Sequence, residues 1–296
     1  MKKQRTQSSG PYRPPNPGKG VLAVPTLRVV AGQYSRQEED LLAVEEPLEV
    51  KLAFGPAARR EVQSLAITMR TPGHDEALAL GFLFTEGIIG KAADVRSMQR
   101  IGQQEAADNI LLVELDEAVT VDFNRLSRHF YTSSSCGVCG KASIDMLRSV
   151  SCYFPRKAFP KIAAQALTGL PERLVEGQAL FGCTGGIHAA AAFDEQGQLL
   201  HLCEDVGRHN ALDKLIGTAL RHGPFPLREQ AVMASGRLSF ELVQKCVMAG
   251  VPILAAVGAP SSLAVELAEQ YGMTLIGFLR DGRFNIYCGA ERVQLP

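Results

Sequence analysis

The sequence has no excess of charge of either sign, because 31 Lys and Arg residues balance 31 Asp and Glu residues. A zero net charge argues against non-specific nucleic-acid binding, which needs surplus cations to neutralise phosphates. The amino terminus lacks the apolar stretch of a secretory signal peptide. Glycine, proline and serine interrupt the uncharged run 246–265, which favours a buried strand over a membrane span. We expect a cytoplasmic protein that binds neither nucleic acid nor membrane.

The sequence also lacks the even, regularly spaced cysteines of a secreted disulfide framework. Its seven cysteines are irregularly spaced, which indicates a reducing compartment. Five of them lie among apolar neighbours or in predicted strands and are expected in the core: Cys152, Cys183, Cys203, Cys246 and Cys288. Cys136 and Cys139 alone form a close pair, so the chemistry is expected there.

The chain of 296 residues is long for one core, and we predict two domains behind a tail. Residues 1–20 hold four prolines, three glycines and five basic residues without an acid, which predicts disorder. Residues 21–131 are predicted to form a smaller α+β domain around a buried helix from His74 to Ile89. Its predicted strands are 27–32, 48–54, 63–68, 110–115 and 119–123.

Residues 132–296 alternate between predicted strands and helices, which is typical of an α/β domain. Strand–helix–strand–helix–strand order implies parallel strands joined by right-handed crossovers. Residues 182–188 are predicted to be a flexible turn. The predicted strands are 187–193, 198–206, 231–234, 252–257, 274–279 and 284–287, and the predicted helices are 207–221, 238–249 and 262–271. A turn at 280–283 is expected to join the last two strands.

The segment Ser133–Lys141 opens this second half and is rich in small residues, which predicts a loop. Its glycines leave the backbone uncrowded, and Lys141 follows at once. A nearby cation and a helix that begins near Ser143 would both favour the thiolate form of Cys136. A thiolate can attack a persulfide or disulfide sulfur and accept it.

Three functions compete for a Cys-x-x-Cys pair: a zinc site, a redox dithiol and a sulfur carrier. Zinc needs two more ligands, and the sequence has no second Cys-x-x-Cys. His74-Asp75-Glu76 matches the first half of the zinc deaminase signature, but Ser135 replaces the proline of its second half. A dithiol would lie at a strand-to-helix junction, which the serines before Cys136 do not resemble. The spacing alone leaves all three functions open.

Candidate phosphate-binding residues follow the predicted strands of the second half. Glu204–Asn210, Ser235-Gly236-Arg237 and Ser261-Ser262 each leave a strand and enter a helix. Helix N-termini at the carboxyl ends of parallel strands offer free N–H groups and a positive dipole end to a ligand. Arg208 could hold a phosphate through two hydrogen bonds. The sequence lacks a Gly-x-Gly-x-x-Gly motif and a P-loop, which argues against an ordinary dinucleotide or ATP fold.

Several of these segments together carry a resemblance to a known family. They are Arg70-Thr71-Pro72-Gly73-His74-Asp75, Leu80-Gly81-Phe82-Leu83, Glu86-Gly87-Ile88, Ser135-Cys136-Gly137-Val138-Cys139-Gly140, Thr184-Gly185-Gly186, His188-Ala189-Ala190, Glu204-Asp205-Val206-Gly207-Arg208-His209, Ala211-Leu212-Asp213-Lys214, Ser235-Gly236-Arg237, Gly277-Phe278 and Gly282-Arg283. In this order, over about residues 48 to 287, the chain resembles the formate dehydrogenase accessory proteins of the FdhD type.

The resemblance implies a sulfurtransferase, a sulfur carrier protein required for formate dehydrogenase activity. A cysteine desulfurase would load Cys136 with a persulfide, with Cys139 in a secondary role. The sulfur would pass to the bis(molybdopterin guanine dinucleotide) cofactor before that cofactor enters apo formate dehydrogenase. The implied fold is a cytidine-deaminase-like α/β domain with a smaller N-terminal domain, assembled as a homodimer. No metal is expected to bind the protein directly.

The resemblance and the strand edge together give the expected cofactor-binding residues. They are Phe278, Leu279, Arg280, Asp281, Gly282 and Arg283, with Ser235 and Arg237 adjacent. GDP is the expected surrogate ligand for the guanine nucleotide end of the cofactor. Two alternatives stand beside this function: a zinc-dependent nucleobase-type deaminase that uses Cys136, Cys139 and His74, and a cofactor chaperone without a covalent step.

Overall fold

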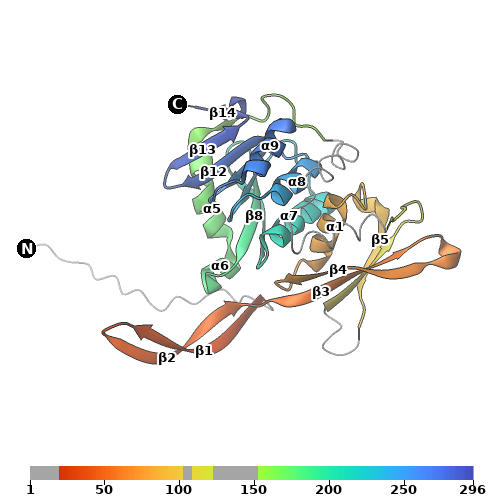
Figure 1. Cartoon of the computed structure of the whole chain (residues 1–296), viewed down its shortest axis with the longest axis horizontal. Coiled ribbons are helices and arrows are strands. Elements are labelled where there is room, and N and C mark those ends of the chain that lie inside the picture. Colours follow the sequence, from red (N-terminus) through yellow and green to blue (C-terminus); the bar gives the residue numbers. More distant parts are fainter. Residues whose placement is uncertain (1–19, 103–108, 123–152, 296) are drawn as a thin grey trace, which may run out of the picture.

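The structure is a computed structural model that describes residues 20–102, 109–122 and 153–295. Within these ranges the strands form a two-stranded arm, a four-stranded sheet, a six-stranded sheet and a small two-stranded sheet (Figure 1). The predicted tail up to residue 19 and the predicted domain boundary at 131/132 lie outside the described residues. Both stay predictions.

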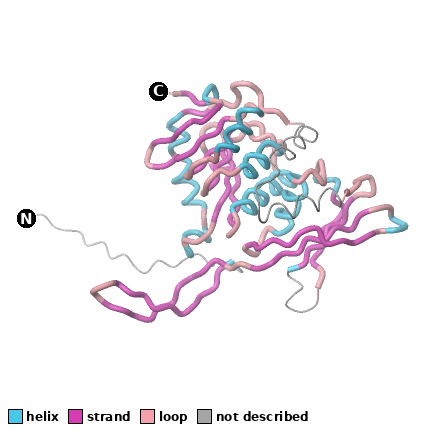
Figure 2. Tube along the Cα trace, in the orientation of Figure 1, coloured by secondary structure: helices cyan, strands magenta, loops and turns pink. Residues whose placement is uncertain are grey.

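The arm is an antiparallel pair of long strands, β1 (Val21–Val30) and β2 (Tyr34–Ala43). It extends away from the rest of the molecule (Figures 1 and 2). The predicted strand 27–32 is wrong at its end, because Gly32 takes a left-handed conformation, φ 74°, in the turn. Strand β2 was not predicted, because its polar run over residues 35–40 shows no apolar alternation.

The four-stranded sheet has the order β4–β3–β6–β5. Its strands are β3 (Glu46–Phe54), β4 (Glu61–Arg70), β5 (Val95–Arg100) and β6 (Ile110–Leu115). Three of them were predicted, and β5 was missed. The strand predicted from Val119 is wrong over the described residues 119–122. Just before these residues, the Asp116 carboxylate accepts a hydrogen bond of 3.0 Å from the Ala118 N–H, which favours a turn.

Helix α1 (Asp75–Thr85) packs between this sheet and helix α7 (Arg208–His222). It is shorter than predicted, because residues 86–89 form a turn rather than a further helical turn. Its apolar side chains join those of both larger sheets in a single core cluster. The first and second halves of the sequence therefore share one core.

The six-stranded sheet has the order β13–β12–β11–β10–β8–β9. Its strands are β8 (His188–Phe193), β9 (Leu199–Asp205), β10 (Ala231–Ala234), β11 (Ile253–Ala256), β12 (Thr274–Arg280) and β13 (Arg283–Cys288). The three consecutive strands β10, β11 and β12 run parallel, as predicted. Hairpins add an antiparallel pair, β8–β9, at one edge and β13 at the other.

Helices cover both faces of the six-stranded sheet (Figure 1). One face carries α7, α8 (Phe240–Met248) and α9 (Ser262–Gln270), and the other carries α4 (Ala164–Thr168) and α5 (Leu170–Gly177). The predicted flexible turn at 182–188 is wrong at its start, because Ala179–Thr184 form helix α6. The remaining elements are the small sheet of β7 (Ile162–Ala163) and β14 (Val293–Gln294) and the 3-10 turns Ala57–Arg59, Ala92–Asp94 and Ala290–Arg292.

The cysteines outside the loop differ from the prediction in two cases. Cys203 and Cys246 are buried as expected, and burial raises the pKa of both thiols. Cys288 is only partly buried, although burial still raises the pKa of its thiol to about 11. Cys183 is also partly buried, because it lies on the short helix α6 rather than in a strand. Cys152 lies outside the described residues.

Candidate functional site

One edge of the six-stranded sheet gathers the carboxyl ends of three strands. The registers place His188 beside Asp205, Ala190 beside Ala234, and Ala234 beside Ala256, so β9, β10 and β11 end at one level. Helices α7, α8 and α9 follow these strands after loops of two, five and five residues. Their N-termini are positive dipole ends, although the Ser261 hydroxyl already accepts from the Ala264 N–H at 3.3 Å in α9. This edge is the arrangement that the sequence predicted for a phosphate ligand.

Ser235 lies at this edge, directly after β10. Its hydroxyl oxygen accepts a hydrogen bond from the Ala189 N–H at 2.9 Å and lies 3.2 Å from Nδ1 of His188. Burial, and then the nearby Arg208 cation, lower the pKa of His188. A neutral imidazole and a positioned hydroxyl therefore stand side by side at the edge. Ser235 was predicted as a site residue but its contact with His188 was not, because strand pairing brings together residues that are 47 positions apart.

Arg208 is the first residue of α7 and carries a positive charge at the positive end of the helix. Its Nε atom is buried and has no hydrogen-bond partner among the described residues. A Cβ built on Gly236 would lie 3.7 Å from Cδ of Arg208 and 3.4 Å from the His188 ring. Arg208 therefore flanks the Ser235–Gly236 turn. An anion bound here would supply the missing acceptor.

The loops after β10 and β11 touch each other and leave the backbone accessible. A Cβ on Gly258 would lie 3.0 Å from the Gly236 carbonyl oxygen and 3.1 Å from Cα of Arg237, so a larger residue would push the two loops apart by a few tenths of an ångström. The Leu238 N–H donates to the Ala259 carbonyl at 3.1 Å, which ties the two loops together. Arg237 itself is exposed. Its side chain is free to reach a ligand over the edge.

The predicted stretch Phe278–Arg283 is divided between two places. Phe278 lies at the edge, where its N–H donates to the Gly258 carbonyl at 3.1 Å, and it holds a left-handed conformation with φ 53°. Leu279 is buried. Asp281 and Gly282, both with positive φ, form the turn that pairs Arg280 with Arg283.

Arg283 lies away from Ser235. Two strands, β11 and β12, separate its strand β13 from β10. It lines an open cavity of about 760 Å³ together with Gln165 and Thr168 on the opposite side, beside α4. The structure thus brings Ser235, Arg237 and Phe278 to one edge but places Arg283 in a neighbouring hollow.

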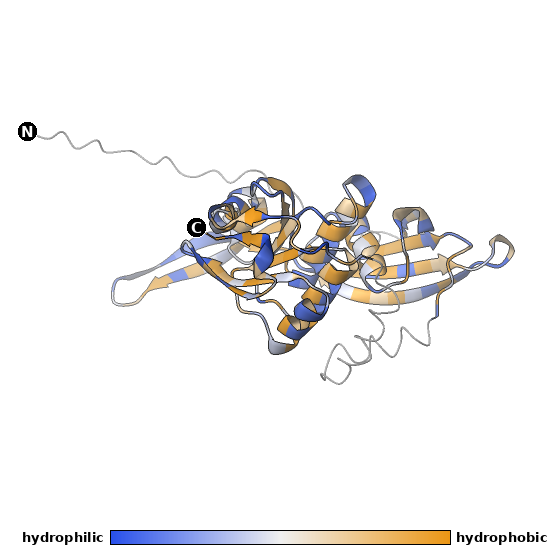
Figure 3. Ribbon diagram, turned by 90° about the horizontal axis from the view of Figure 1, so that it is seen from above, coloured by the Kyte–Doolittle hydropathy of each residue, from blue (hydrophilic) through white to orange (hydrophobic). Residues whose placement is uncertain are grey.

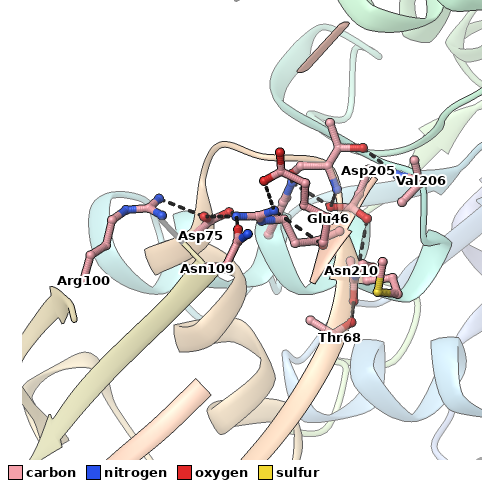
Figure 4. Close-up of polar contacts among 12 residues, drawn as sticks. Glu46, Thr68, Asp75, Arg100, Asn109, Asp205, Val206 and Asn210 are labelled. Atoms are coloured by element: carbon pink, nitrogen blue, oxygen red, sulfur yellow. Dashed lines mark hydrogen bonds and ion pairs between the residues drawn. The ribbon is translucent and has the colours of Figure 1, made fainter. Parts of the chain in front are cut away.

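A second polar cluster joins two of the sequence motifs (Figure 4). Arg70 donates two hydrogen bonds of 3.1 Å to the Asp75 carboxylate, and Arg100 donates a third, of 2.8 Å. Asp205 accepts from the Thr71 N–H at 3.2 Å and forms an ion pair of 2.7 Å with Lys214. These motif residues are buried and satisfied, so they hold the two halves of the chain together.

Of the residues of the zinc alternative, the structure describes only His74. His74 precedes α1 in a left-handed conformation, φ 57°, and lines a polar cavity beside Arg70. Cys136 and Cys139 lie outside the described residues. Within residues 20–102, 109–122 and 153–295, no group of three His, Cys, Asp or Glu side chains is placed to hold a metal ion. In the same ranges, no helix is both long and apolar enough to cross a membrane.

A smaller cavity of about 330 Å³ lies where the two halves meet. Its polar lining includes His209, Asp213 and Lys245, against apolar side chains of α1 and β3. Lys245 donates a hydrogen bond of 2.9 Å to Asp213, and both side chains are buried. Burial, with the Arg208 cation as the next cause, lowers the pKa of His209 to about 4. His209 therefore enters this cavity as a neutral imidazole.

The architecture defines the class of protein: a mixed α/β fold with a six-stranded sheet, a four-stranded sheet and a projecting arm. The same fold occurs in a crystal structure from Desulfotalea psychrophila, described as a formate dehydrogenase accessory protein. The two superpose with a TM-score of 0.69, covering 93% of this chain and 99% of the other, at 24% identity.

The sequence then gives the family. A profile of the FdhD/NarQ family matches residues 43–294. The chain is 46% identical to the sulfur carrier protein FdhD of Streptomyces avermitilis over 91% of this chain and 94% of that protein. The sulfur carrier protein FdhD of Sulfurisphaera tokodaii is 44% identical over 86% of this chain and 92% of its own length. This chain belongs to the FdhD/NarQ family.

Proposed function

We propose that this protein is a sulfur carrier that serves the maturation of a formate dehydrogenase. The observation that carries the proposal is the 44–46% identity, over nearly the whole chain, to proteins named as sulfur carriers. In the proposed step, the Cys136 thiolate attacks the outer sulfur of a cysteine desulfurase persulfide. The S–S bond of the donor breaks, the desulfurase thiolate leaves, and Cys136 holds the new persulfide. Cys139 has a secondary role.

The proposed acceptor is the bis(molybdopterin guanine dinucleotide) cofactor, which is substrate rather than resident group. The protein acts in the cytoplasm as a homodimer and passes the sulfurated cofactor to apo formate dehydrogenase. Residues 132–296 form a cytidine-deaminase-like domain in this proposal. The parallel strands β10–β12 with helices on both faces support that assignment.

The guanine nucleotide end of the cofactor is proposed to bind at the edge that carries Ser235, Arg237 and Phe278. Three helix N-termini converge there, and the buried Nε of Arg208 has no acceptor among the described residues. Phe278 is partly exposed beside the edge and offers an aromatic face to a base. The hairpin turn Arg280–Arg283 is proposed to contact the cofactor from the neighbouring hollow beside α4.

The experiment that tests the sulfur-carrier function is intact mass spectrometry after incubation with a desulfurase and cysteine. The unchanged protein is expected to gain the mass of one sulfur atom, and peptide mapping is expected to place it on Cys136. Cys136→Ala should lose this gain and fail to mature formate dehydrogenase, whereas Cys139→Ala should be affected less. Equal sulfur loading of Cys136→Ala and the unchanged protein would contradict the proposal.

The nucleotide site is tested separately by GDP titration of folded variants. Arg237→Ala and Arg283→Ala are each expected to weaken GDP binding by on the order of 1–3 kcal/mol, as for a lost charge-assisted contact. Both should still accept sulfur on Cys136. Arg221→Ala is the matched control, because Arg221 is exposed at the opposite end of α7. GDP affinities equal to that of the control would show that the site is misplaced.

A further inference from the structure

The cavity of about 330 Å³ between the two halves of the chain combines apolar walls with a polar lining. Strands β3 and β4 and helix α1 supply its apolar walls, and helices α7 and α8 supply most of its polar residues. Figure 3 shows hydrophobic residues on the helices and sheet strands in the centre of the molecule. A volume of this size lies near the lower limit for ligand pockets, so the cavity fits one ring system rather than a whole nucleotide.

The buried Lys245 ammonium in the lining already uses its three N–H groups within the protein. It donates to the Thr85 hydroxyl and to the Asp213 carboxylate, each at 2.9 Å. It also forms an ion pair of 3.6 Å with Glu86. A ligand in the cavity therefore meets an ammonium whose hydrogen bonds are already made.

The donors on the side of β4 are also taken. The Asn210 amide donates to the Met69 carbonyl at 2.8 Å and to the Asp205 carboxylate at 3.2 Å. The Thr68 hydroxyl donates to Oδ1 of Asn210 at 3.2 Å (Figure 4). Thr68 and Asn210 therefore offer a ligand oxygen acceptors but no N–H or O–H group.

A chain of hydrogen bonds fixes the chemistry of His209. The Ser239 hydroxyl donates to the Glu241 carboxylate, so its oxygen accepts from Nε2 of His209, 3.3 Å away. His209 is neutral at pH 7, because burial lowers its pKa to about 4. A neutral imidazole with its proton on Nε2 keeps Nδ1 as an acceptor. Burial opposes the ionisation of Glu241, but hydrogen bonds from Ser239 and from its own N–H outweigh burial and lower its pKa.

The lining thus suits a ligand that brings its own N–H donors. Three carboxylates, those of Glu86, Asp213 and Glu241, accompany one ammonium and a neutral imidazole. This negative lining disfavours phosphate and other anions. The apolar walls favour a flat ring. A heterocycle with an amino group beside a ring N–H presents two parallel donors, which one carboxylate can accept as a pair.

The cavity also adjoins the edge of the six-stranded sheet. His209, which lines the cavity, directly follows Arg208 in α7. A Cβ on Gly236 would lie 3.7 Å from Cδ of Arg208. The Gly236 carbonyl accepts from the Gly258 N–H at 3.3 Å, and the Gly258 carbonyl accepts from the Phe278 N–H at 3.1 Å. These contacts form a continuous path from the cavity past Arg208 to Phe278.

We propose that this cavity binds the pterin ring of the molybdenum cofactor, whose amino group and adjacent ring N–H donate to the Glu241 carboxylate. The inference rests on the proposed function, which names the cofactor, and adds a second subsite to the nucleotide edge. Guanine carries the same pair of donors, but the proposed nucleotide site already takes the guanine end beside Phe278. A pterin in the cavity and a guanine at Phe278 leave the linking phosphates beside Arg208, which agrees with the order of groups along the cofactor.

Titration with neopterin, a pterin that carries no phosphate, tests the cavity in the full-length protein. The chain has no tryptophan, so the fluorescence of the pterin is observed against a low protein background. The unchanged protein is expected to bind neopterin. Glu241→Gln is expected to weaken this binding at least about tenfold, because the charged acceptor is lost. Ala66→Leu fills the cavity from β4 and is expected to weaken the binding by a similar factor.

Glu266→Gln is the matched control, because Glu266 is exposed on α9 and lies outside the lining of the cavity. Its affinity for neopterin is expected to equal that of the unchanged protein. Circular dichroism checks that all three variants fold.

Equal neopterin affinities of Glu241→Gln, Ala66→Leu and the control would overturn the pterin subsite. Displacement of neopterin by an equal concentration of guanosine would overturn it too, because the cavity would then take guanine. GDP titration of the unchanged protein separates these failures from a failure of the proposed function. If GDP binds and neopterin does not, only the pterin subsite is lost, whereas failure of both ligands counts against the cofactor as substrate.

Discussion

His209 shows how the fold changes the chemistry of a single residue. It lies in the first turn of α7, and its Nε2 atom is 3.3 Å from the Ser239 hydroxyl. Burial is the largest cause of its lowered pKa, and the neighbouring Arg208 cation is the next. The sequence placed His209 in a first turn but gave no indication of this burial, which depends on elements that pack from both halves of the chain.

The lowered pKa of His209 makes the stability of the folded protein sensitive to acid. Between pH 6.5 and about 4 the unfolded chain binds a proton at this position and the folded chain does not. The free energy of unfolding therefore falls as the pH falls through this window, by about 1–3 kcal/mol from this residue. His209→Gln should lose less stability on acidification than the unchanged protein does, measured by urea unfolding at pH 7 and pH 4.5.

The control for this prediction is His222→Gln, which removes an exposed histidine at the other end of the same helix. Its loss of stability between the two pH values is expected to match that of the unchanged protein. If His209→Gln also matches the unchanged protein, His209 does not contribute to the acid sensitivity.

At the scale of elements, the crossing of α1 and α7 depends on two glycines. A Cβ on Gly81 would lie 1.9 Å from the Asp213 carbonyl oxygen, and one on Gly217 would lie 1.9 Å from the Ala77 carbonyl oxygen. The two helices therefore touch backbone to backbone. Gly81 stands in a motif that carried the family resemblance, and the structure gives the physical reason for a glycine there.

Gly81→Ala and Gly217→Ala are each expected to lower the free energy of unfolding by about 3 kcal/mol or more, because the backbones must separate. Helix propensity alone predicts the opposite, a gain of about 1 kcal/mol for alanine within a helix. The sign of the change in the free energy of unfolding, measured with urea, therefore decides between backbone contact and helix propensity as the dominant effect. Gly90→Ala is the control, since its added Cβ would meet no atom closer than 3.6 Å.

At the scale of the whole molecule, Asp205 forms a buried contact between the two halves of the sequence. This residue is fully buried and accepts a hydrogen bond from Thr71 in the first half, while it pairs with Lys214 in the second. Lys214 in turn donates to the Thr71 carbonyl at 2.8 Å. The contact reinforces the core that α1 shares with α7.

Asp205→Asn should therefore destabilise the whole chain by about 3–5 kcal/mol, because it leaves Lys214 buried without its counter-charge. Urea unfolding at pH 7 measures the loss, with Glu195→Gln as the control in an exposed turn. The control is expected to change stability by less than about 0.5 kcal/mol. An Asp205→Asn midpoint equal to that of the control would show that the ion pair contributes no stability.

Local sequence patterns correctly predicted most strands and helices in the second half of the chain. The strand and helix alternation from 231 to 279 predicted three parallel strands, and the structure has them as β10, β11 and β12. Alternation works there because the strands are short, apolar and bounded by glycine or proline turns. The same patterns failed for β2 and β5, whose exposed polar residues give no periodic signal.

The sequence by itself determined the family motifs and the edge where the parallel strands end, and it predicted a reactive thiol at Cys136. Only the tertiary structure decided which distant residues meet at that edge, His188 with Ser235 and Gly258 with Arg237, and that Arg283 lies away from it, beside α4. The tertiary structure also decided that the two motifs that contain Arg70 and Asp205 are buried where the halves of the chain meet. The physical reason is that local patterns report on neighbours along the chain, whereas burial and hydrogen bonds such as that from Thr71 to Asp205 join segments more than a hundred residues apart.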